Sequence, residues 1–181
     1  MNKVISYSIE DYKKARPEGK LGNLVADIIF EKAKKNDPDV DFCILNNGGL
    51  RSPIYKGGLT IGNVYELMPF DNTIVTLTIT YADLRKLFDY LINVGGEPIS
   101  NIFFFTTNNV LDSVFINNKK ITKKNYRVAT SDYLANGGDK MDFFLNPISY
   151  NNTGVLIRDV LIEHFSNTDT IKSNIDGRFQ F

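Results

Sequence analysis

Apolar residues recur at intervals of three and four along four stretches of the chain, the spacing that places them on one face of a helix. The third stretch carries its own boundary signals: Thr80 precedes it, Asp83 follows three residues later as in a capping box, and two glycines at 95–96 stop it. The sequence Asn-Asp-Pro-Asp at 36–39 ends the first stretch. The predicted helices cover residues 21–35, 60–67, 80–95 and 154–165.

Five other segments have the length and composition of β-strands. Residues 73–80 read Thr-Ile-Val-Thr-Leu-Thr-Ile-Thr, and this alternation predicts a half-buried strand. The sequence Asn-Asn-Lys-Lys at 117–120 predicts a hairpin connection. The predicted strands cover residues 40–45, 73–80, 102–107, 110–116 and 126–131.

Helices and strands are mixed along the chain, so we expect an α+β fold in a single domain, with a mixed β-sheet packed with helices. The 181 residues suit one domain with a hydrophobic core. We assign residues 20–181 to this domain and residues 1–19 to an N-terminal arm or linker. The first sixteen residues show no pattern that distinguishes a linker, a strand and a docking arm.

Charge and composition narrow the classes of function. Basic and acidic residues both number 21, so the formal net charge is zero, and the chain lacks the basic footprint expected of a nucleic-acid-binding protein. No apolar run reaches the length of a membrane span, and residues 1–7 lack the apolar centre of a signal peptide. The single cysteine, Cys43, lies in an apolar segment, where we expect a small buried hydrophobe.

A loop at residues 46–58 is the first candidate ligand-binding segment. It follows a predicted strand directly and holds four glycines, which let the backbone approach a ligand closely. Asn46 offers a hydrogen-bond donor and an acceptor, and Arg51 offers a planar guanidinium suited to phosphate or carboxylate. Taken alone, the spacing of this loop favours a tight turn with a surface arginine.

Two more loops carry similar chemistry. In the segment 132–139, Tyr133 is a flat amphipathic ring, and Asp139 follows two glycines and can accept hydrogen bonds from two sugar hydroxyls. In the segment 67–72, Phe70 follows a proline at a predicted helix end. Each loop alone fits a capping aspartate or a core phenylalanine. Together the three loops offer two aromatic faces, an amide, an anion and a cation, which is the set that a nucleoside needs.

At these positions the sequence resembles the C-terminal domains of 5'-nucleotidases, such as animal ecto-5'-nucleotidase and bacterial periplasmic UDP-sugar hydrolase. Residues 43–54, Cys-Ile-Leu-Asn-Asn-Gly-Gly-Leu-Arg-Ser-Pro-Ile, are similar to the asparagine–glycine–arginine signature of that family. Residues 67–72, 134–139 and 21–27 resemble its proline–phenylalanine loop, its second glycine loop and the opening of its first helix. The four segments occur in the family's order and spacing, from about residue 21 to residue 143.

The resemblance implies a role for each candidate residue. Phe70 and Tyr133 would hold the base between their rings, with tyrosine where the family usually has phenylalanine. Asn46 would hydrogen-bond the base edge, Asp139 would hold the ribose hydroxyls, and Arg51 would reach the ribose or the phosphate. Possible further contacts are Gly48, Gly49, Asn136 and Arg16. Relatives have an arginine shortly before the first helix. Arg16 lies one residue away from that position, which Pro17 occupies here.

The resemblance also implies what this chain lacks. In the family, hydrolysis takes place in a separate N-terminal domain, at a two-metal centre built from aspartate, asparagine and several histidines. His164 is the single histidine of this chain. We therefore expect this chain to bind no metal and to hydrolyse no phosphate ester alone. The two divalent metals would belong to a metallophosphatase domain or to a separate subunit.

Two hypotheses about function follow. In the first, the chain is the nucleotide-binding part of a 5'-nucleotidase that acts on nucleotides such as AMP. It would be a piece of a longer enzyme or one subunit of a split enzyme, and Met1 together with the closing segment 176–181 fits the second slightly better. In the other, it is a stand-alone nucleoside-binding or regulatory module.

A third hypothesis, chemistry at Cys43 or Asp139, lacks a neighbouring group that would tune either residue. The resemblance implies an extracytoplasmic location, in the periplasm or at the cell surface. The preferred base and the number of phosphates stay open, because one asparagine and two rings do not determine them.

Overall fold

The structure is a computed structural model that describes residues 1–108 and 110–180. Asn109 and Phe181, the last residue of the predicted domain, lie outside the described residues. Short 3-10 turns occur at Asn47–Gly49, Gly138–Lys140 and Asp142–Phe144. The helices of the described residues are α1 (Lys20–Asn36), α2 (Ile61–Leu67), α3 (Tyr81–Val94), α4 (Asp132–Ala135) and α5 (Ile157–Ser166).

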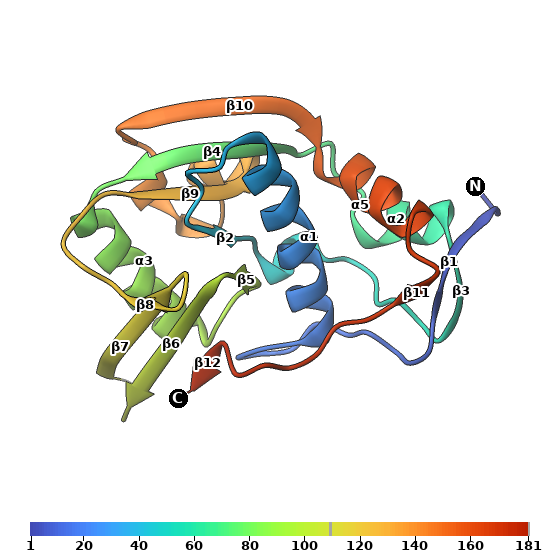
Figure 1. Cartoon of the computed structure of the whole chain (residues 1–181), viewed down its shortest axis with the longest axis horizontal. Coiled ribbons are helices and arrows are strands. Elements are labelled where there is room, and N and C mark those ends of the chain that lie inside the picture. Colours follow the sequence, from blue (N-terminus) through green and yellow to red (C-terminus); the bar gives the residue numbers. More distant parts are fainter. Residues whose placement is uncertain (109, 181) are drawn as a thin grey trace.

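The strands of the described residues form three sheets, and Figure 1 shows their arrangement. The central sheet has the order β10 (Ser149–Leu156), β4 (Thr73–Ile79), β9 (Tyr126–Ser131), β2 (Phe42–Ile44) and β5 (Ile99–Ser100). A second sheet joins β11 (Thr170–Ile171), β1 (Val4–Ser8) and β3 (Gly57–Thr60). The third joins β12 (Phe179–Gln180), β6 (Ile102–Thr107), β7 (Val110–Ile116) and β8 (Lys119–Lys120). Because parallel and antiparallel pairs occur together, the expected mixed α+β fold is confirmed.

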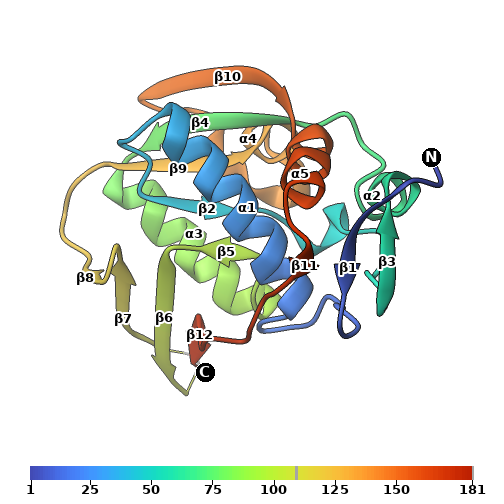
Figure 2. The same ribbon diagram turned by 45° about the vertical axis from the view of Figure 1, so that its right-hand side comes forward.

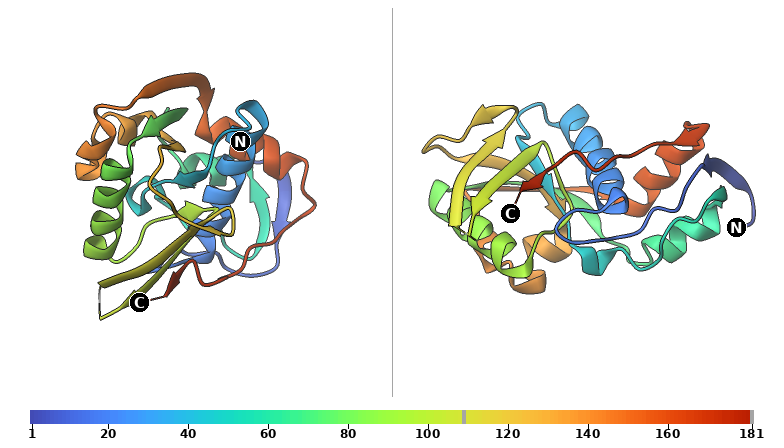
Figure 3. Two further views of the ribbon diagram at one scale, coloured as in Figure 1. Left: turned by 60° about the vertical axis from the view of Figure 1, so that its left-hand side comes forward. Right: turned by 90° about the horizontal axis from the view of Figure 1, so that it is seen from below.

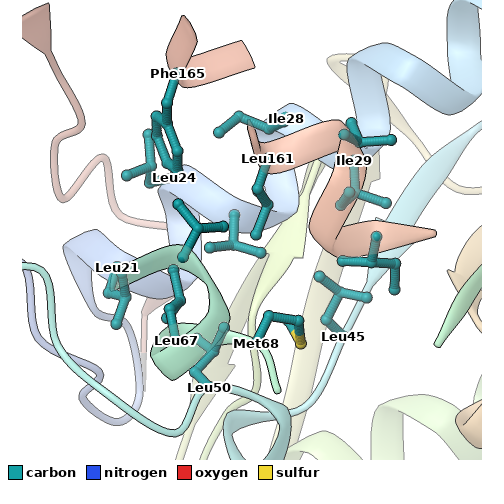
Figure 4. Packing of buried hydrophobic residues seen from close by; sticks show 14 of the residues in the cluster. Leu21, Leu24, Ile28, Ile29, Leu45, Leu50, Leu67, Met68, Leu161 and Phe165 are labelled. Carbon is teal, nitrogen blue, oxygen red and sulfur yellow. The ribbon is translucent and has the colours of Figure 1, made fainter. Parts of the chain in front are cut away.

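Strands β2, β4 and β9 of the central sheet are buried on both faces, whereas the edge strand β10 is mostly exposed. Along β2, Phe42 and Ile44 point into one apolar cluster and Cys43 into the other, as the two-residue period of a strand requires. The cluster around Cys43 includes residues of α1, α2 and α5, and Figure 4 shows Leu24 and Ile28 of α1 beside Leu161 and Phe165 of α5. The other cluster includes residues of α3, β6 and β7. In Figure 2, α1 passes in front of the central strands.

The smaller sheets flank this three-layer centre. Figures 1 and 3 place the β6–β7 hairpin and the β1–β3 pair at opposite ends of the molecule. Residues 4–8, within the segment assigned to an arm or linker, form β1, which pairs antiparallel with β3 and parallel with β11. The predicted hairpin connection is confirmed: Asn117 and Asn118 take φ of 53° and 57° between β7 and β8, as in a two-residue hairpin turn.

Strand β4 differs from the prediction. Its alternating sequence predicted one exposed face, but Thr76 is buried between Val75 and Leu77. The half-buried prediction is therefore wrong, because β4 lies between β10 and β9 and both its faces are covered. Arg127 donates from Nη2 to the Thr76 hydroxyl over 3.3 Å, so the buried threonine has a polar partner.

Helix boundaries follow the predicted signals except in the last helix. The Thr80 hydroxyl accepts the Asp83 amide at 3.1 Å, and Gly95 ends α3 with φ of 75°. The last helix was predicted from residue 154, but Gly154 belongs to β10 and has φ of 70°. Helix α5 begins at Ile157 because the preceding residues pair with β4 through an irregular register.

Candidate functional site

Three loops meet at one edge of the central sheet. Strands β2 and β9 are parallel neighbours, so their carboxyl ends lie at the same edge. The Asn46 loop follows β2 and the Tyr133 segment follows β9. Strand β4 runs antiparallel to β9, so the loop that leads into β4, with Phe70, reaches the same edge. The sheet topology therefore brings together three segments that are far apart in sequence.

These loops enclose a cavity of about 330 Å³. Phe70 is 41% exposed and Tyr133 is 46% exposed, although both are large aromatic residues. All five primary candidate residues and two of the possible ones line the cavity, and Asn72 joins them without having been singled out in the sequence. The lining residues are Asn46, Gly48, Gly49, Arg51, Phe70, Asn72, Tyr133 and Asp139.

Asp139 is the centre of the polar network in this cavity. Asn46 donates from Nδ2 to Asp139 Oδ2 over 2.5 Å, and the Tyr133 hydroxyl donates to Asp139 Oδ1 over 2.8 Å. The Asp139 amide donates to the Tyr133 hydroxyl over 3.3 Å. A carboxylate, an amide and a phenol from two loops therefore form one connected group of hydrogen-bonding atoms.

The glycines of the first loop leave room for Asn46. A Cβ atom on Gly49 would lie 2.9 Å from Asn46 Oδ1, and one on Gly48 would lie 3.1 Å from Asn46 Nδ2. A Cβ atom on Gly138 would lie 2.5 Å from the Tyr133 ring. The loop backbones therefore lie directly against the candidate side chains, and a Cβ atom at these glycines would crowd them.

Arg51 lies at one side of the cavity. Its guanidinium carbon is 5.9 Å from the centre of the Phe70 ring, within the range of a cation–π contact. Arg51 also lines a second cavity of about 210 Å³, together with Lys13 and Lys14. A positive region therefore adjoins the aromatic side chains.

Two of the possible contacts, Arg16 and Asn136, do not line the cavity. Arg16 donates from Nη2 to Glu97 Oε1 over 2.6 Å and from Nε to the Gly96 carbonyl over 3.0 Å. Asn136 donates from Nδ2 to the Asp132 carbonyl over 2.8 Å, at the end of α4. Both side chains are thus engaged with the protein itself.

Buried Glu97 supports the Asn46 loop. Its Oε2 atom accepts the Asn47 amide over 2.6 Å, while its other oxygen pairs with Arg16. Lys14 Nζ donates to the Asn47 and Leu50 carbonyls over 3.2 and 3.1 Å. Sequence reasoning missed this support, because an isolated Glu and an isolated Lys carry no local signal of a partner that lies far away along the chain.

The Phe70 loop is held by a second residue that the sequence did not reveal. Arg158 on α5 donates from Nη2 to Asp71 Oδ1 over 2.5 Å and from Nη1 to the Phe70 carbonyl over 3.4 Å. Its guanidinium carbon lies 4.3 Å from the centre of the Tyr65 ring. Helix α5 therefore fixes the backbone that presents the Phe70 ring to the cavity.

The local electrostatics keep the phenols near the cavity protonated. The hydrogen bond to Asp139, together with the charge of that carboxylate, raises the pKa of Tyr133. Burial, followed by the charges of Glu97 and Asp139, raises the pKa of Tyr90 to about 12. Tyr133 therefore acts as a hydrogen-bond donor to Asp139 at neutral pH.

In the part of the chain that the structure describes, neither a metal site nor a reactive thiol accompanies this cavity. Among residues 1–108 and 110–180, no group of three or more His, Cys, Asp or Glu side chains is arranged to hold a metal ion. Burial raises the pKa of the Cys43 thiol, and Cys43 is fully enclosed. Within the same residues, no helix has both the length and the apolar character needed to cross a membrane.

Fold and site together define a domain whose candidate binding cavity is built by loops at one edge of a mixed sheet. Residues 4–146 match the protein family described as 5'-nucleotidase, C-terminal domain. The chain belongs to this family.

Known proteins agree with this membership. The chain is 30% identical over 185 residues to the trifunctional nucleotide phosphoesterase protein YfkN of Bacillus subtilis (strain 168), covering 90% of this chain and 12% of that protein. It is 30% identical to a 5'-nucleotidase of Vibrio vulnificus (strain CMCP6), covering 85% of this chain and 28% of that protein. The structure of a 5'-nucleotidase precursor from Thermus thermophilus matches 99% of this chain and 39% of its own, with a TM-score of 0.85 at 21% identity. The chain thus spans only a fraction of the length of these relatives.

Proposed function

We propose that this domain binds the base and the ribose of a nucleotide and presents the phosphate to a two-metal phosphatase domain or subunit that is not in this chain. The observation that carries the proposal is the cavity itself, where two exposed aromatic rings from separate loops share one space with Asn46, Arg51 and Asp139. Exposed aromatic rings beside a polar network favour a flat ligand with hydrogen-bonding edges.

Each group in the cavity has a chemical counterpart in a nucleotide. Phe70 and Tyr133 offer π-faces for the base, and the Asn46 amide offers a donor and an acceptor for the base edge. Asp139 offers carboxylate oxygens to the ribose hydroxyls. Arg51 offers a guanidinium to the phosphate, and its place between the aromatic cavity and the lysine-lined cavity supports that orientation.

The missing chemistry belongs to the same proposal. In this proposal, hydrolysis takes place in the metallophosphatase part, at its two divalent ions, as the resemblance to 5'-nucleotidases implies. The names of the relatives, nucleotide phosphoesterase and 5'-nucleotidase, support a nucleotide substrate. An extracytoplasmic site of action is part of this proposal and follows the resemblance to periplasmic and cell-surface enzymes.

Calorimetric titration of the purified chain with adenosine and AMP tests the binding. Phe70→Ala should weaken both affinities by roughly five- to 150-fold, which corresponds to about 1–3 kcal/mol for one stacking partner. Tyr150→Ala is a matched control, because Tyr150 is also an exposed aromatic residue, at 47%, but lies on β10 and does not line the cavity. An unchanged affinity in Phe70→Ala would reject the stacking assignment.

A phosphate-release assay tests the division of labour. With AMP and added Mg²⁺, Mn²⁺ or Zn²⁺, the chain alone should release no phosphate above the rate without protein. Turnover that persists through repurification would show that this chain carries its own hydrolytic centre and would overturn that part of the proposal.

A further inference from the structure

The Tyr133 hydroxyl is joined to Asp139 by two hydrogen bonds. It donates to the Oδ1 atom of the side chain over 2.8 Å and accepts from the backbone amide over 3.3 Å. The phenol oxygen thus fixes the carboxylate and the backbone of Asp139 relative to the ring. Because the ring lines the cavity, the surface offered to a flat ligand and the carboxylate offered to a sugar are joined in one unit.

The backbone of Asp139 needs such support. Asp139 has φ of 51° and ψ of 29°, in the left-handed region that residues other than glycine rarely adopt. The preceding Gly138 packs against the Tyr133 ring so closely that a Cβ atom would lie 2.5 Å from it. Ring, hydroxyl and loop backbone therefore hold one another in place.

The hydrogen bonds to Asp139 leave some acceptor positions of its carboxylate free. A carboxylate has about four acceptor positions, two on each oxygen. The Tyr133 hydroxyl occupies one position on Oδ1, and Asn46 Nδ2 occupies one on Oδ2 over 2.5 Å. With respect to the described residues, one position on each oxygen stays available, which matches the two neighbouring hydroxyls of a ribose.

We propose that the Tyr133 hydroxyl is a positioning group for the sugar: it orients Asp139 so that the site selects ligands with a 2',3'-diol over deoxyribose ligands. This inference rests on the proposed nucleoside site and adds a determinant of its sugar selectivity. The ring of Tyr133 contributes to base binding, whereas its hydroxyl acts on the ribose through Asp139. The two contributions can be separated, because phenylalanine keeps the ring and lacks the hydroxyl.

The test is calorimetric titration of the full chain and of Tyr133→Phe with adenosine and 2',3'-dideoxyadenosine. The original chain should bind adenosine more tightly. Tyr133→Phe should weaken adenosine binding by roughly three- to tenfold, the range for one ordinary intramolecular hydrogen bond, and should change dideoxyadenosine binding by less than about twofold. Tyr150→Phe, which removes a phenol outside the cavity, should change neither affinity.

A double-mutant cycle tests whether the hydroxyl acts through Asp139. Asp139→Asn should reduce the preference for adenosine, and adding Tyr133→Phe to it should reduce that preference no further. If Tyr133→Phe weakens the binding of adenosine and dideoxyadenosine equally, the hydroxyl has a merely structural role and the inference is overturned. An unchanged or increased preference of Tyr133→Phe for adenosine would overturn it as well. These results leave the proposed function intact, whereas a chain that binds no nucleoside at all rejects both.

Discussion

Gly49→Ala should disable the cavity while leaving the fold in place. A Cβ atom at this position would lie 2.9 Å from Asn46 Oδ1, closer than real Cβ atoms approach an oxygen, and 3.9 Å from Met68 Sδ, an ordinary contact. Gly49 has no left-handed φ, so the added methyl strains the contact with Asn46 and not the backbone. The perturbation therefore acts on one side chain of the site.

Its size follows from the same distances. Ordinary contact begins at 3.4 Å, so Asn46 Oδ1 must move by about 0.5 Å, the difference between 3.4 and 2.9 Å. The side chain is almost buried and is tied to Asp139, so it cannot simply swing into solvent. A shift of this size reaches the limit of about 0.5 Å within which a binding site must hold its groups. Loss of the Asn46–Asp139 bond and of one ligand bond corresponds to about 1–3 kcal/mol, or roughly five- to 150-fold in Kd.

The assay compares adenosine titrations with thermal unfolding. Gly49→Ala should show the weakened Kd with little change in Tm, because alanine also restricts the unfolded chain by about 0.4–1 kcal/mol in favour of folding. Gly62→Ala is the control: its Cβ atom would meet nothing closer than 3.4 Å, within helix α2. Wild-type affinity in Gly49→Ala would refute the reasoning that Asn46 is a packed, preset ligand group.

Two further predictions concern the rest of the molecule. Cys43 should resist 5,5'-dithiobis(2-nitrobenzoate) in the native protein and react only as fast as the chain unfolds, because its thiol is fully buried and its pKa is raised. Rapid labelling of the native protein would contradict this placement. Burial opposes the charged form of Asp83, but bonds to Lys86 and Thr80 outweigh it and lower its pKa below 3.8. The folded form is therefore stabilised above that pH, and the gain is lost as the pH falls through the lowered value. Asp83→Asn should accordingly reduce the fall in Tm between pH 5 and pH 3, and an identical fall would argue against this pairing.

Local signals in the sequence sufficed for much of the fold. The Thr80 cap and the Gly95 stop are interactions between near neighbours, so the residues themselves define the ends of α3. Three glycines of the two loops, Gly48, Gly49 and Gly138, were also informative, because each relieves contact with a side chain only a few residues away, as Gly49 does for Asn46. The site was predicted from three such loops taken together, because their joint occurrence indicated a ligand site more strongly than any one loop did.

The sequence patterns did not predict arrangements that depend on residues far apart along the chain. The alternation of β4 is the same for an edge strand and for a central one, and only its neighbours on both sides bury Thr76. Strand β10, which the sequence patterns did not predict as a strand, forms because β4 offers it an edge. Glu97 binds Asn47, which lies 50 residues away along the chain, and Arg158 binds Asp71, which lies 87 residues away. No spacing rule connects such positions.

The support of the Asn46 loop changes how the N-terminal segment should be regarded. Strand β1 pairs with β3 and β11. Lys14 donates hydrogen bonds to two carbonyls of the loop. Arg16 pairs with Glu97, which accepts the Asn47 amide. Glu97 accepts the N–H of Asn47 and Lys14 donates to its C=O, so the backbone on both sides of this residue has little freedom to adjust when a ligand arrives. We infer that the first residues stabilise the site without lining its aromatic cavity. Arg16 would then act on nucleotide binding through the loop backbone, in place of a direct contact with the phosphate.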